Sequence, residues 1–464
     1  MPRRPRETTA VPLPPAPRRT VLATALAALA TAFGPAASGT VRPPGPGDPS
    51  SEGRAATTVG HHAWASAADW RAGTGNGTAP GRRSGLVMER AAGRVPYHDP
   101  HSGRTGNWEY ATWLSPLHRS AVPAGELIAY WNATTPAGTW LRTEVQGTYT
   151  DGTLTPWYTM GIWASGDGDV LRTSVDGQQD GTSSVRTDTV AVGEDTPLRL
   201  AAFRMRLTLY RAPGSRATPV VRRLGVTTSD LPARFEVPAT APGEAADREL
   251  TVPAYSQNVH TGRYPQYDNG GEAWCSPASS QMVVEYWGHR PTAADLAWVD
   301  PSYDDPQVCH AARATYDHQY EGCGNWPFNA AYAASHPGLQ AVVTRLDSLT
   351  AAERLVAAGI PVITSQSFHE KELTGAGYGT AGHLMTVTGF TALGDVIVND
   401  PAGRNNRDVR RIYNRREFEN VWLRTRRKDA EGRTRSASGG VCYLYWPSRA
   451  TPAQLAALSA AGVR

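Results

Sequence analysis

Residues 272–278, with the sequence EAWCSPA, constrain the fold more than any other part of the chain. Ser276 is a preferred helix N-cap and Pro277 a preferred first helical residue, which together predict that a helix begins there. Apolar side chains then recur at helical spacing as far as residue 287, and a glycine follows. Cys275 would therefore sit at the positive end of a helix that packs into a core, where the helix dipole favours a thiolate. The alternative is a buried structural cysteine.

A second candidate lies far downstream, where a glycine-rich loop runs into a strand. Residues 379–390 and 396–401 predict a hairpin with a turn between them. If odd-numbered residues pair with even-numbered ones, His383 and Asp400 share one face of this hairpin, whereas the other register separates them. Cysteine, histidine and carboxylate in this order are the nucleophile, base and orienting group of a thiol mechanism. Asn399 is the alternative orienter, but neighbouring strand residues face opposite ways, so only one of the two can serve.

The region from residue 250 to residue 447 resembles the C39-like cysteine peptidases, which have a papain-like fold. The resemblance is carried by VPAYSQ at 252–257, by Cys275 before a helix, by His383 on a strand and by NDP at 399–401. One departure is a serine after the cysteine, where many relatives have glycine.

The resemblance implies a role for each motif residue. It implies that Cys275 and His383 carry out the chemistry, that Asp400 orients the imidazole, and that Gln257 donates to an oxyanion. It implies no metal and no organic cofactor.

Charge and composition exclude some classes of function. The 464 residues include 46 basic and 42 acidic ones, a net charge of +4, which is too small to indicate a nucleic-acid-binding protein. Lys371 and Lys428 are the only lysines. The arginines clustered between residues 404 and 416 are interpreted as a solvated face.

The N-terminus is typical of an export signal. Arg18 and Arg19 form a twin-arginine-like pair before an apolar run over residues 21–32, and small residues follow. That run is shorter than the roughly 18 residues that span a bilayer, so we expect cleavage between Ala32 and Gly39. The mature protein would then be secreted or held at the cell surface, without stable insertion in a membrane.

The chain has four cysteines. If Cys275 is the nucleophile, an oxidising compartment permits a disulfide between Cys309 and Cys323, which leaves Cys442 buried and unpaired. The competing interpretation is a zinc site made of Cys309, His310, His318 and Cys323, whose spacing matches no common zinc pattern.

Composition divides the chain into segments. The expected segments are an export signal at 1–38, a linker at 39–59, a β-sandwich at 60–237, a second linker at 238–249, the peptidase-like domain at 250–448 and a tail at 449–464. Because the second linker has no apolar period, we expect few contacts to cross it and the two halves to be separable.

Short alternating runs predict the antiparallel sandwich, with strands expected at 127–131, 139–145, 157–163 and 198–205. This region holds eight tryptophans, and alternation favours a core role for them over an exposed carbohydrate-binding surface. Helices are expected at 276–287, 293–298, 306–316, 328–335 and 349–358, with strands after them, which makes an α+β domain.

We therefore expect an exported cysteine peptidase that acts on peptide or protein substrates. Cell-wall peptide amidase and transglutaminase-like acyltransferase activities share the same nucleophile and base and stay open. A non-catalytic adhesin or carbohydrate-binding protein is the alternative from another class, and an intact Cys, His and Asp set argues against it.

Overall fold

The computed structural model of the chain describes residues 58–81 and 85–463. The expected export signal at 1–38 and almost all of the linker at 39–59 lie outside the described residues. No helix within the described ranges is long and apolar enough to cross a membrane.

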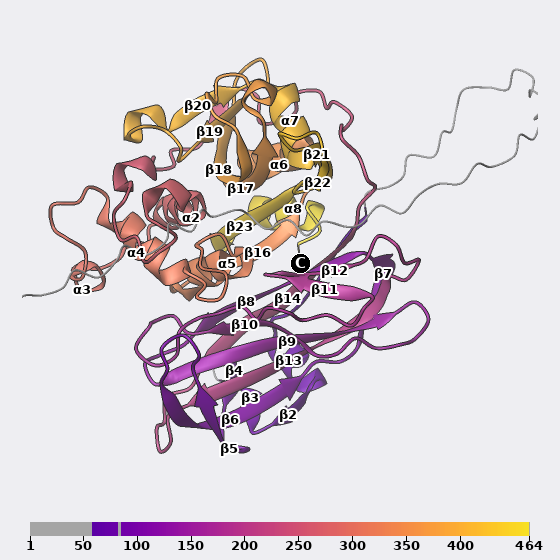
Figure 1. The fold of residues 1–464 in the computed structure, drawn as a ribbon, viewed down its shortest axis with the longest axis vertical. Coiled ribbons are helices and arrows are strands. Elements are labelled where there is room, and N and C mark those ends of the chain that lie inside the picture. Colours follow the sequence, from indigo (N-terminus) through magenta and orange to yellow (C-terminus); the bar gives the residue numbers. More distant parts are fainter. Residues whose placement is uncertain (1–57, 82–84, 464) are drawn as a thin grey trace, which may run out of the picture. The chain divides into compact units, whose positions relative to one another are not determined.

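The N-terminal part consists of two antiparallel sheets of seven strands each (Figure 1). One sheet has the order β11-β12-β8-β14-β4-β3, with β1 also on β14; its strands are β1 (Thr58–Trp64), β3 (Thr78–Pro80), β4 (Leu86–Met88), β8 (Glu126–Thr134), β11 (Ser183–Arg186), β12 (Thr189–Val192) and β14 (Val220–Asp230). The other has the order β10-β9-β13-β6-β2, with β5 on β6 and β7 on β13; its strands are β2 (Thr74–Asn76), β5 (Gly93–His98), β6 (Thr105–Leu114), β7 (His118–Ala124), β9 (Thr139–Tyr149), β10 (Tyr158–Trp163) and β13 (Leu200–Arg211). A short helix, α1 (Ala67–Ala72), was not expected.

The tryptophans of this part fill its interior. Seven of the eight are buried, which confirms the core interpretation: Trp64, Trp70, Trp108, Trp113, Trp131, Trp140 and Trp163. The eighth, Trp157, is half-buried beneath the guanidinium of Arg206, 4.4 Å from the ring centroid. These buried rings therefore leave no exposed tryptophan surface for stacking on sugars.

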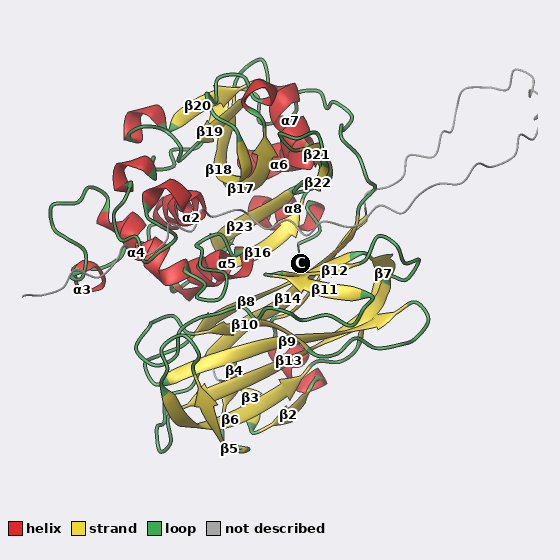
Figure 2. Cartoon of the chain, viewed as in Figure 1, coloured by secondary structure: helices red, strands yellow, loops and turns green. Residues whose placement is uncertain are grey.

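The C-terminal part is an α+β arrangement with one antiparallel sheet (Figure 2). The sheet order is β16-β23-β17-β18-β19-β20, with β15 on β18; the strands are β15 (Arg248–Glu249), β16 (Leu339–Arg345), β17 (Val362–Phe368), β18 (Thr380–Phe390), β19 (Val396–Asn399), β20 (Arg410–Tyr413) and β23 (Val441–Pro447). A separate ribbon pairs β21 (Arg426–Lys428) with β22 (Thr434–Ser436). The five expected helices are present as α2 (Cys275–Tyr286), α3 (Ala293–Leu296), α4 (Pro306–Thr315), α5 (Trp326–Ser335) and α6 (Leu349–Ala357).

The start of α2 differs from the prediction by one residue. Trp274 is the cap and Cys275 the first helical residue. Ser276 is buried, and its hydroxyl bonds the phenol of Tyr443 at 3.0 Å instead of capping the helix. Cys275 therefore lies at the helix N-terminus, as expected. Ser276, the predicted cap, makes a tertiary contact instead.

Two helices of the C-terminal part were also missed. In α7 (Arg415–Leu423), Asn414 caps the first turn by accepting from two backbone amides. Arg415 is buried and pairs with the buried Glu353 at 2.9 Å, so the interpretation of the arginine cluster as a solvated face is wrong at this residue. The second, α8 (Pro452–Ala460), lies in the expected tail and begins with a capping box formed by Thr451 and Gln454.

The outer edge of β16 is paired with side chains from β8 and β14. The Asn132 amide donates to the Ala341 carbonyl at 2.7 Å and accepts from the Ala341 amide at 3.1 Å. Two residues along the edge, the Thr227 hydroxyl donates to the Val343 carbonyl at 2.8 Å. A strand edge normally leaves such groups unpaired. Here the N-terminal part completes the C-terminal sheet.

The second linker is not a free tether. Ala245 is buried, and the Thr240 hydroxyl donates to Glu419 at 2.6 Å. The Gly243 amide donates to Glu353 at 3.1 Å. Buried carboxylates of α6 and α7 thus hold this segment in place. The expectation of few contacts between the two halves is wrong as well, because Asn132 and Thr227 bind the backbone of β16. Consistent with this, residues 55–464 form one compact unit.

The predicted disulfide is also wrong, because all four cysteines are free. Cys309 and Cys323 are buried and have other neighbours: the Cys309 sulfur lies 3.5 Å from Nδ1 of His260, and the Cys323 thiol donates to the Ala312 carbonyl at 3.5 Å. The zinc alternative finds no support either, since within the described ranges no group of three His, Cys, Asp or Glu residues could hold a metal ion.

The edge pairing predicts the effect of one substitution. Asn132→Leu should lower the free energy of unfolding by about 3 kcal/mol, because it leaves one donor and one acceptor of Ala341 buried and unpaired, at about 1–3 kcal/mol each. Thr227→Val leaves one acceptor unpaired and should cost about half as much. Urea unfolding of the two variants and the wild type measures this. Equal stability of Asn132→Leu and wild type would contradict it.

Thiol labelling provides a second prediction. Burial raises the pKa of Cys309 to about 12 and that of Cys442 still further, so iodoacetamide at neutral pH should modify only the half-exposed Cys275 in the folded protein. Denaturation without reductant should expose four reactive thiols. Intact-protein mass spectrometry counts the adducts. Two adducts instead of four after denaturation would show that a disulfide is present.

Candidate active site

Cys275 lies where α2 begins, at a half-exposed position that lines a cleft. The Trp274 indole donates to the Tyr267 carbonyl at 2.7 Å and fixes the residue before it. The first amides of a helix have no partner within the helix, so Cys275 is surrounded by free donors and the positive end of the dipole.

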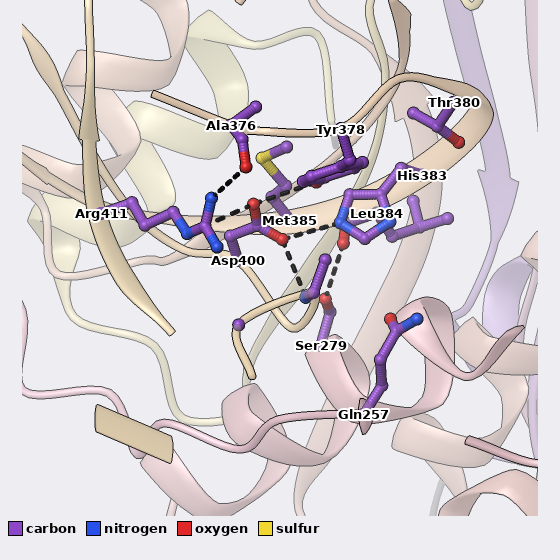
Figure 3. Close-up of polar contacts among 12 residues, drawn as sticks. Gln257, Ser279, Ala376, Tyr378, Thr380, His383, Leu384, Met385, Asp400 and Arg411 are labelled. Carbon is purple, nitrogen blue, oxygen red and sulfur yellow. Dashed lines mark hydrogen bonds and ion pairs between the residues drawn. The ribbon is translucent and has the colours of Figure 1, made fainter. Parts of the chain in front are cut away.

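His383 lies on β18, the strand against which α2 packs. The Ser279 hydroxyl, one turn into α2, donates to the Leu384 carbonyl at 3.2 Å and fixes the helix beside the histidine (Figure 3). His383 is only 4% exposed. Its imidazole is therefore held between the helix and the strands rather than free to rotate.

The hairpin of β18 and β19 has the expected register near the site. Thr386 pairs with Asn399 and Val387 with Val398, so odd numbers face even ones. A bulge between Val387 and Gly389 then shifts the pairing, and the register is even from Gly389 to the turn. The parity argument thus holds at the end of the hairpin that carries His383 and fails beyond the bulge.

The expected pair of His383 and Asp400 is formed. Nε2 of His383 lies 2.8 Å from Oδ1 of Asp400, and both side chains are buried (Figure 3). The other oxygen, Oδ2, accepts from the hydroxyls of Tyr378 at 3.0 Å and Tyr413 at 2.7 Å. The Ala402 amide donates to Oδ1 at 2.9 Å, so both carboxylate oxygens have donors.

His383 and Asp400 each stabilise the charged form of the other. Burial by itself would lower the pKa of His383, but the charges of Asp400 and Cys275 and hydrogen bonds to both raise it to about 10. Burial opposes the ionisation of Asp400, yet His383, by its charge and its hydrogen bond, and Tyr413, by its hydrogen bond, bring the pKa of Asp400 to about 2. Because Nε2 is engaged by Asp400, Nδ1 is the ring nitrogen left for Cys275, which lines the same cleft.

Asn399 points away from this cluster. Its amide donates to the carbonyls of Pro253 at 2.9 Å and Val252 at 3.2 Å and so ties β19 to the start of the C-terminal part. Of the two candidate orienters, Asp400 is therefore the one that contacts the imidazole.

Gln257 lines the same cleft as Cys275. Its backbone amide donates to the Pro401 carbonyl at 2.9 Å, which anchors it next to Asp400. Its side-chain Nε2 donates to the Glu272 carbonyl at 2.6 Å, while Oε1 is buried without a partner. One N–H of the amide is thus engaged, and one is left for a ligand.

Three partners of Asp400 were not found from the sequence: Tyr378, Tyr413 and Arg411, whose Nε lies 3.9 Å from Oδ2. The tyrosines stand on a loop and a strand without any motif around them. Arg411 belonged to the cluster that was interpreted as solvated. Only the clustering of arginines after Asp400 could have indicated that Arg411 lies near this carboxylate.

The cleft around these residues has a volume of about 730 Å³. One wall comes from α2 and β18, and another from β17 and the segment before β23. Arg186, Thr187 and Asp188, at the turn between β11 and β12, line it as well. The N-terminal part therefore contributes directly to the cleft.

Comparison with known proteins identifies two consecutive regions. Residues 60–229 match the model of the peptidase C39 N-terminal domain, and residues 249–430 match that of the peptidase C39-like family. No curated protein matches the chain. The crystal structure of a candidate C39-like peptidase from Bacillus anthracis is 17% identical and is covered in full, against 44% of this chain, with a TM-score of 0.26 that is too low to bear on the fold.

The two matches adjoin along the chain and together span most of its described residues. The first match covers the part that supplies the turn between β11 and β12. The second covers the part that holds Cys275, His383 and Asp400. The N-terminal part is therefore similar to the peptidase C39 N-terminal domain, and the C-terminal part to the peptidase C39-like family.

Proposed function

We propose that this protein is an exported cysteine peptidase that hydrolyses peptide bonds with Cys275, His383 and Asp400. The observation that carries the proposal is the hydrogen bond between the buried Asp400 and the ring of His383, which lines one cleft with the thiol at the start of α2. Nucleophile, base and orienting carboxylate in hydrogen-bonded order are what thiol catalysis needs. The C39-like family match supports the same reaction class.

In the first half-reaction, the Cys275 sulfur attacks the carbonyl carbon of the scissile peptide bond while His383 holds the proton that came from the thiol. The tetrahedral intermediate collapses, the C–N bond breaks, and the imidazolium gives its proton to the leaving amine. A thioester remains on Cys275. In the second half, His383 takes a proton from water, whose oxygen attacks the thioester. The acid product leaves as the proton returns to the sulfur.

Asp400 has two functions in this scheme. It holds the imidazole in one orientation and tautomer, and its charge stabilises the imidazolium that forms in each half-reaction. Burial and the charge of Asp400 raise the pKa values of Tyr378 and Tyr413, so both phenols stay protonated and donate to Asp400 throughout the cycle.

The oxyanion would be bound by the backbone amide of Cys275 and the remaining N–H of Gln257. Removing one such donor typically costs about 3–4 kcal/mol of transition-state stabilisation. The anchoring of Gln257 to the Pro401 carbonyl supports this assignment, because it links the donor to the segment that carries Asp400.

The finer description of the fold is part of the proposal. We infer a papain-like domain preceded by a β-sandwich, because in the N-terminal part both sheets contribute side chains to one buried cluster. The twin-arginine-like N-terminus supports export and a secreted or cell-surface location. The substrate would be a peptide or protein, with cell-wall peptide as one member of that class.

Activity assays test the proposal directly. Casein, a peptide library and purified peptidoglycan are incubated with the wild type, with and without iodoacetamide. We expect peptide cleavage that iodoacetamide abolishes. Release of cell-wall peptides alone would favour the amidase, and transfer to added amines would favour an acyltransferase.

Substitutions within the site should have graded effects. Cys275→Ala should reduce kcat by about 10⁶-fold and His383→Ala by a similar factor, whereas Asp400→Asn should cost about 10²–10⁴-fold. Asn399→Ala is the matched control, because it removes buried hydrogen bonds one residue away and should lower stability but not kcat. Full activity of Cys275→Ala would reject the mechanism. An inactive Asn399→Ala beside an active Asp400→Asn would move the orienter by one residue.

The pair should also make stability depend on pH. The pKa of His383 is raised from 6.5 to about 10, so its contribution is complete below about pH 6.5 and is lost as the pH rises towards 10. The pKa of Asp400 is lowered from 3.8 to about 2, so its contribution is present above 3.8 and is lost as the pH falls towards 2. The difference in unfolding free energy between wild type and Asp400→Asn should therefore be larger at about pH 6 than at about pH 9.5. Urea unfolding at both values measures it, and a constant difference would contradict the pairing.

A further inference from the structure

Beside His383 lies a buried amide that nothing in the described structure pairs. Gln366 is directly opposite His383 in the ladder of β17 and β18, and paired residues of an antiparallel sheet face the same way. It lines the cleft and is only 1% exposed. Neither its Nε2 nor its Oε1 has a hydrogen-bond partner.

An amide in this state destabilises the unliganded protein. Buried polar groups without a partner destabilise a folded protein, and native proteins contain few of them. A primary amide has an N–H donor and an acceptor side by side, which match the C=O and N–H of one residue in an extended chain, where both groups point to the same side. Gln366 is therefore suited to bind the main chain of a substrate next to the reacting carbonyl.

The cleft continues from Gln366 towards the N-terminal part. The Ser438 side chain packs on β17 through the Ser365 carbonyl, and Ser436 and Ala437 precede it. Beyond them stands Arg186, which lines both this cleft and a smaller adjoining hollow of about 130 Å³.

The turn that carries Arg186 is firmly held. The Asp188 carboxylate accepts from the Trp326 amide, at the start of α5, at 2.9 Å. Thr187 adopts a left-handed conformation with φ of 55°. The turn is therefore a fixed part of the cleft wall rather than a loose loop.

Arg186 is the unpaired cation of this region. The other arginines that line the smaller hollow have acidic partners: Arg199 with Asp230, Arg345 with Glu126, and Arg426 with Glu194. The exposed side chain of Arg186 has neither an ion pair nor a hydrogen bond among the described residues.

Three acidic residues line the cleft: Asp188, which stands on the same turn as Arg186, Asp268 and Glu272. Each carboxylate already accepts a backbone N–H, from Trp326 at 2.9 Å, from Cys323 at 2.9 Å and from Gly262 at 3.3 Å. Arg186 has no such partner among the described residues, so its positive charge is left for a carboxylate of a ligand.

We propose that Gln366 and Arg186 form a substrate subsite on the β17 side of His383, in which Gln366 holds a peptide group and Arg186 binds a carboxylate. The inference rests on the proposed function and adds the substrate class: peptides with an acidic group near the scissile bond. That group is an acidic side chain or a free C-terminal carboxylate. The N-terminal part then selects the substrate that the C-terminal part cleaves.

The test uses synthetic peptides whose sequence is taken from a bond cleaved in the library. One set is acetylated and amidated and carries Glu or Gln at each position around that bond, and another has Gln throughout and a free C-terminus. Four enzymes are compared: wild type, Arg186→Gln, Gln366→Leu and the control Arg71→Gln, which removes an exposed arginine of α1. Binding of the same peptides to Cys275→Ala, by calorimetry, provides a readout that needs no cleavage.

At one position the kcat/KM of the wild type should be about three- to fivefold higher for the Glu peptide than for the Gln peptide, which is the effect of a partly exposed ion pair. Arg186→Gln should abolish this preference, and Arg71→Gln should keep it. Gln366→Leu should lower kcat/KM about tenfold for both peptides, because two hydrogen bonds are lost, while its melting temperature stays level or rises. A preference only for the free C-terminus would assign the carboxylate to the chain end.

The outcomes separate the two proposals. Cleavage without any preference for a carboxylate, or a preference that survives in Arg186→Gln, overturns the subsite and leaves the peptidase standing. Unchanged kcat/KM in Gln366→Leu overturns the part played by Gln366. If the library yields no cleaved bond, Glu and Gln forms of random peptides are tested for binding alone. A carboxylate preference there keeps the subsite and rejects the peptidase, and no preference rejects both.

Discussion

The sheet that carries the active site depends on a strand edge that it cannot complete by itself. β16 is the outer strand, and its free backbone groups at Ala341 and Val343 are paired by the side chains of Asn132 and Thr227. Unpaired groups at a buried edge would cost several kcal/mol, so the N-terminal part stabilises the outer strand of the sheet. From this edge the ladder continues through β23 and β17 to β18, the strand of His383. What resembles an accessory domain in composition is a structural component of the catalytic one.

Within the site, Asp400 connects most of the chemistry. One oxygen orients the imidazole while the other is held by two phenols, and the neighbouring Asn399 faces the opposite way to secure the strand. Two adjacent polar residues at the end of β19 thus serve opposite faces, Asp400 towards His383 and Asn399 towards the start of the C-terminal part. The bulge between Val387 and Gly389 lies just beyond them, so the hairpin changes register only after the site has been built.

The parts that could be predicted from the sequence are those fixed by local rules. Helix chemistry around Cys275 and strand parity around His383 and Asp400 need only near neighbours in the chain. The misses involve distant partners. Arg415 seemed solvated because Glu353, which neutralises it, lies on another helix, and Ser276 seemed a cap because Tyr443 is far along the chain. The predicted disulfide was wrong for a similar reason. The spacing of two cysteines shows that they can meet, but not that His260 lies against one sulfur and the Ala312 carbonyl against the other.

The four free thiols have a consequence for how the protein matures. Because no covalent cross-link has to form, the chain needs neither an oxidant nor a disulfide isomerase to reach its final structure. Folding can be completed in a reducing compartment, and the product would be the same in an oxidising one. Three of the thiols are sealed in the interior and only Cys275 is accessible, so oxidative damage would fall on the proposed nucleophile and leave the architecture intact.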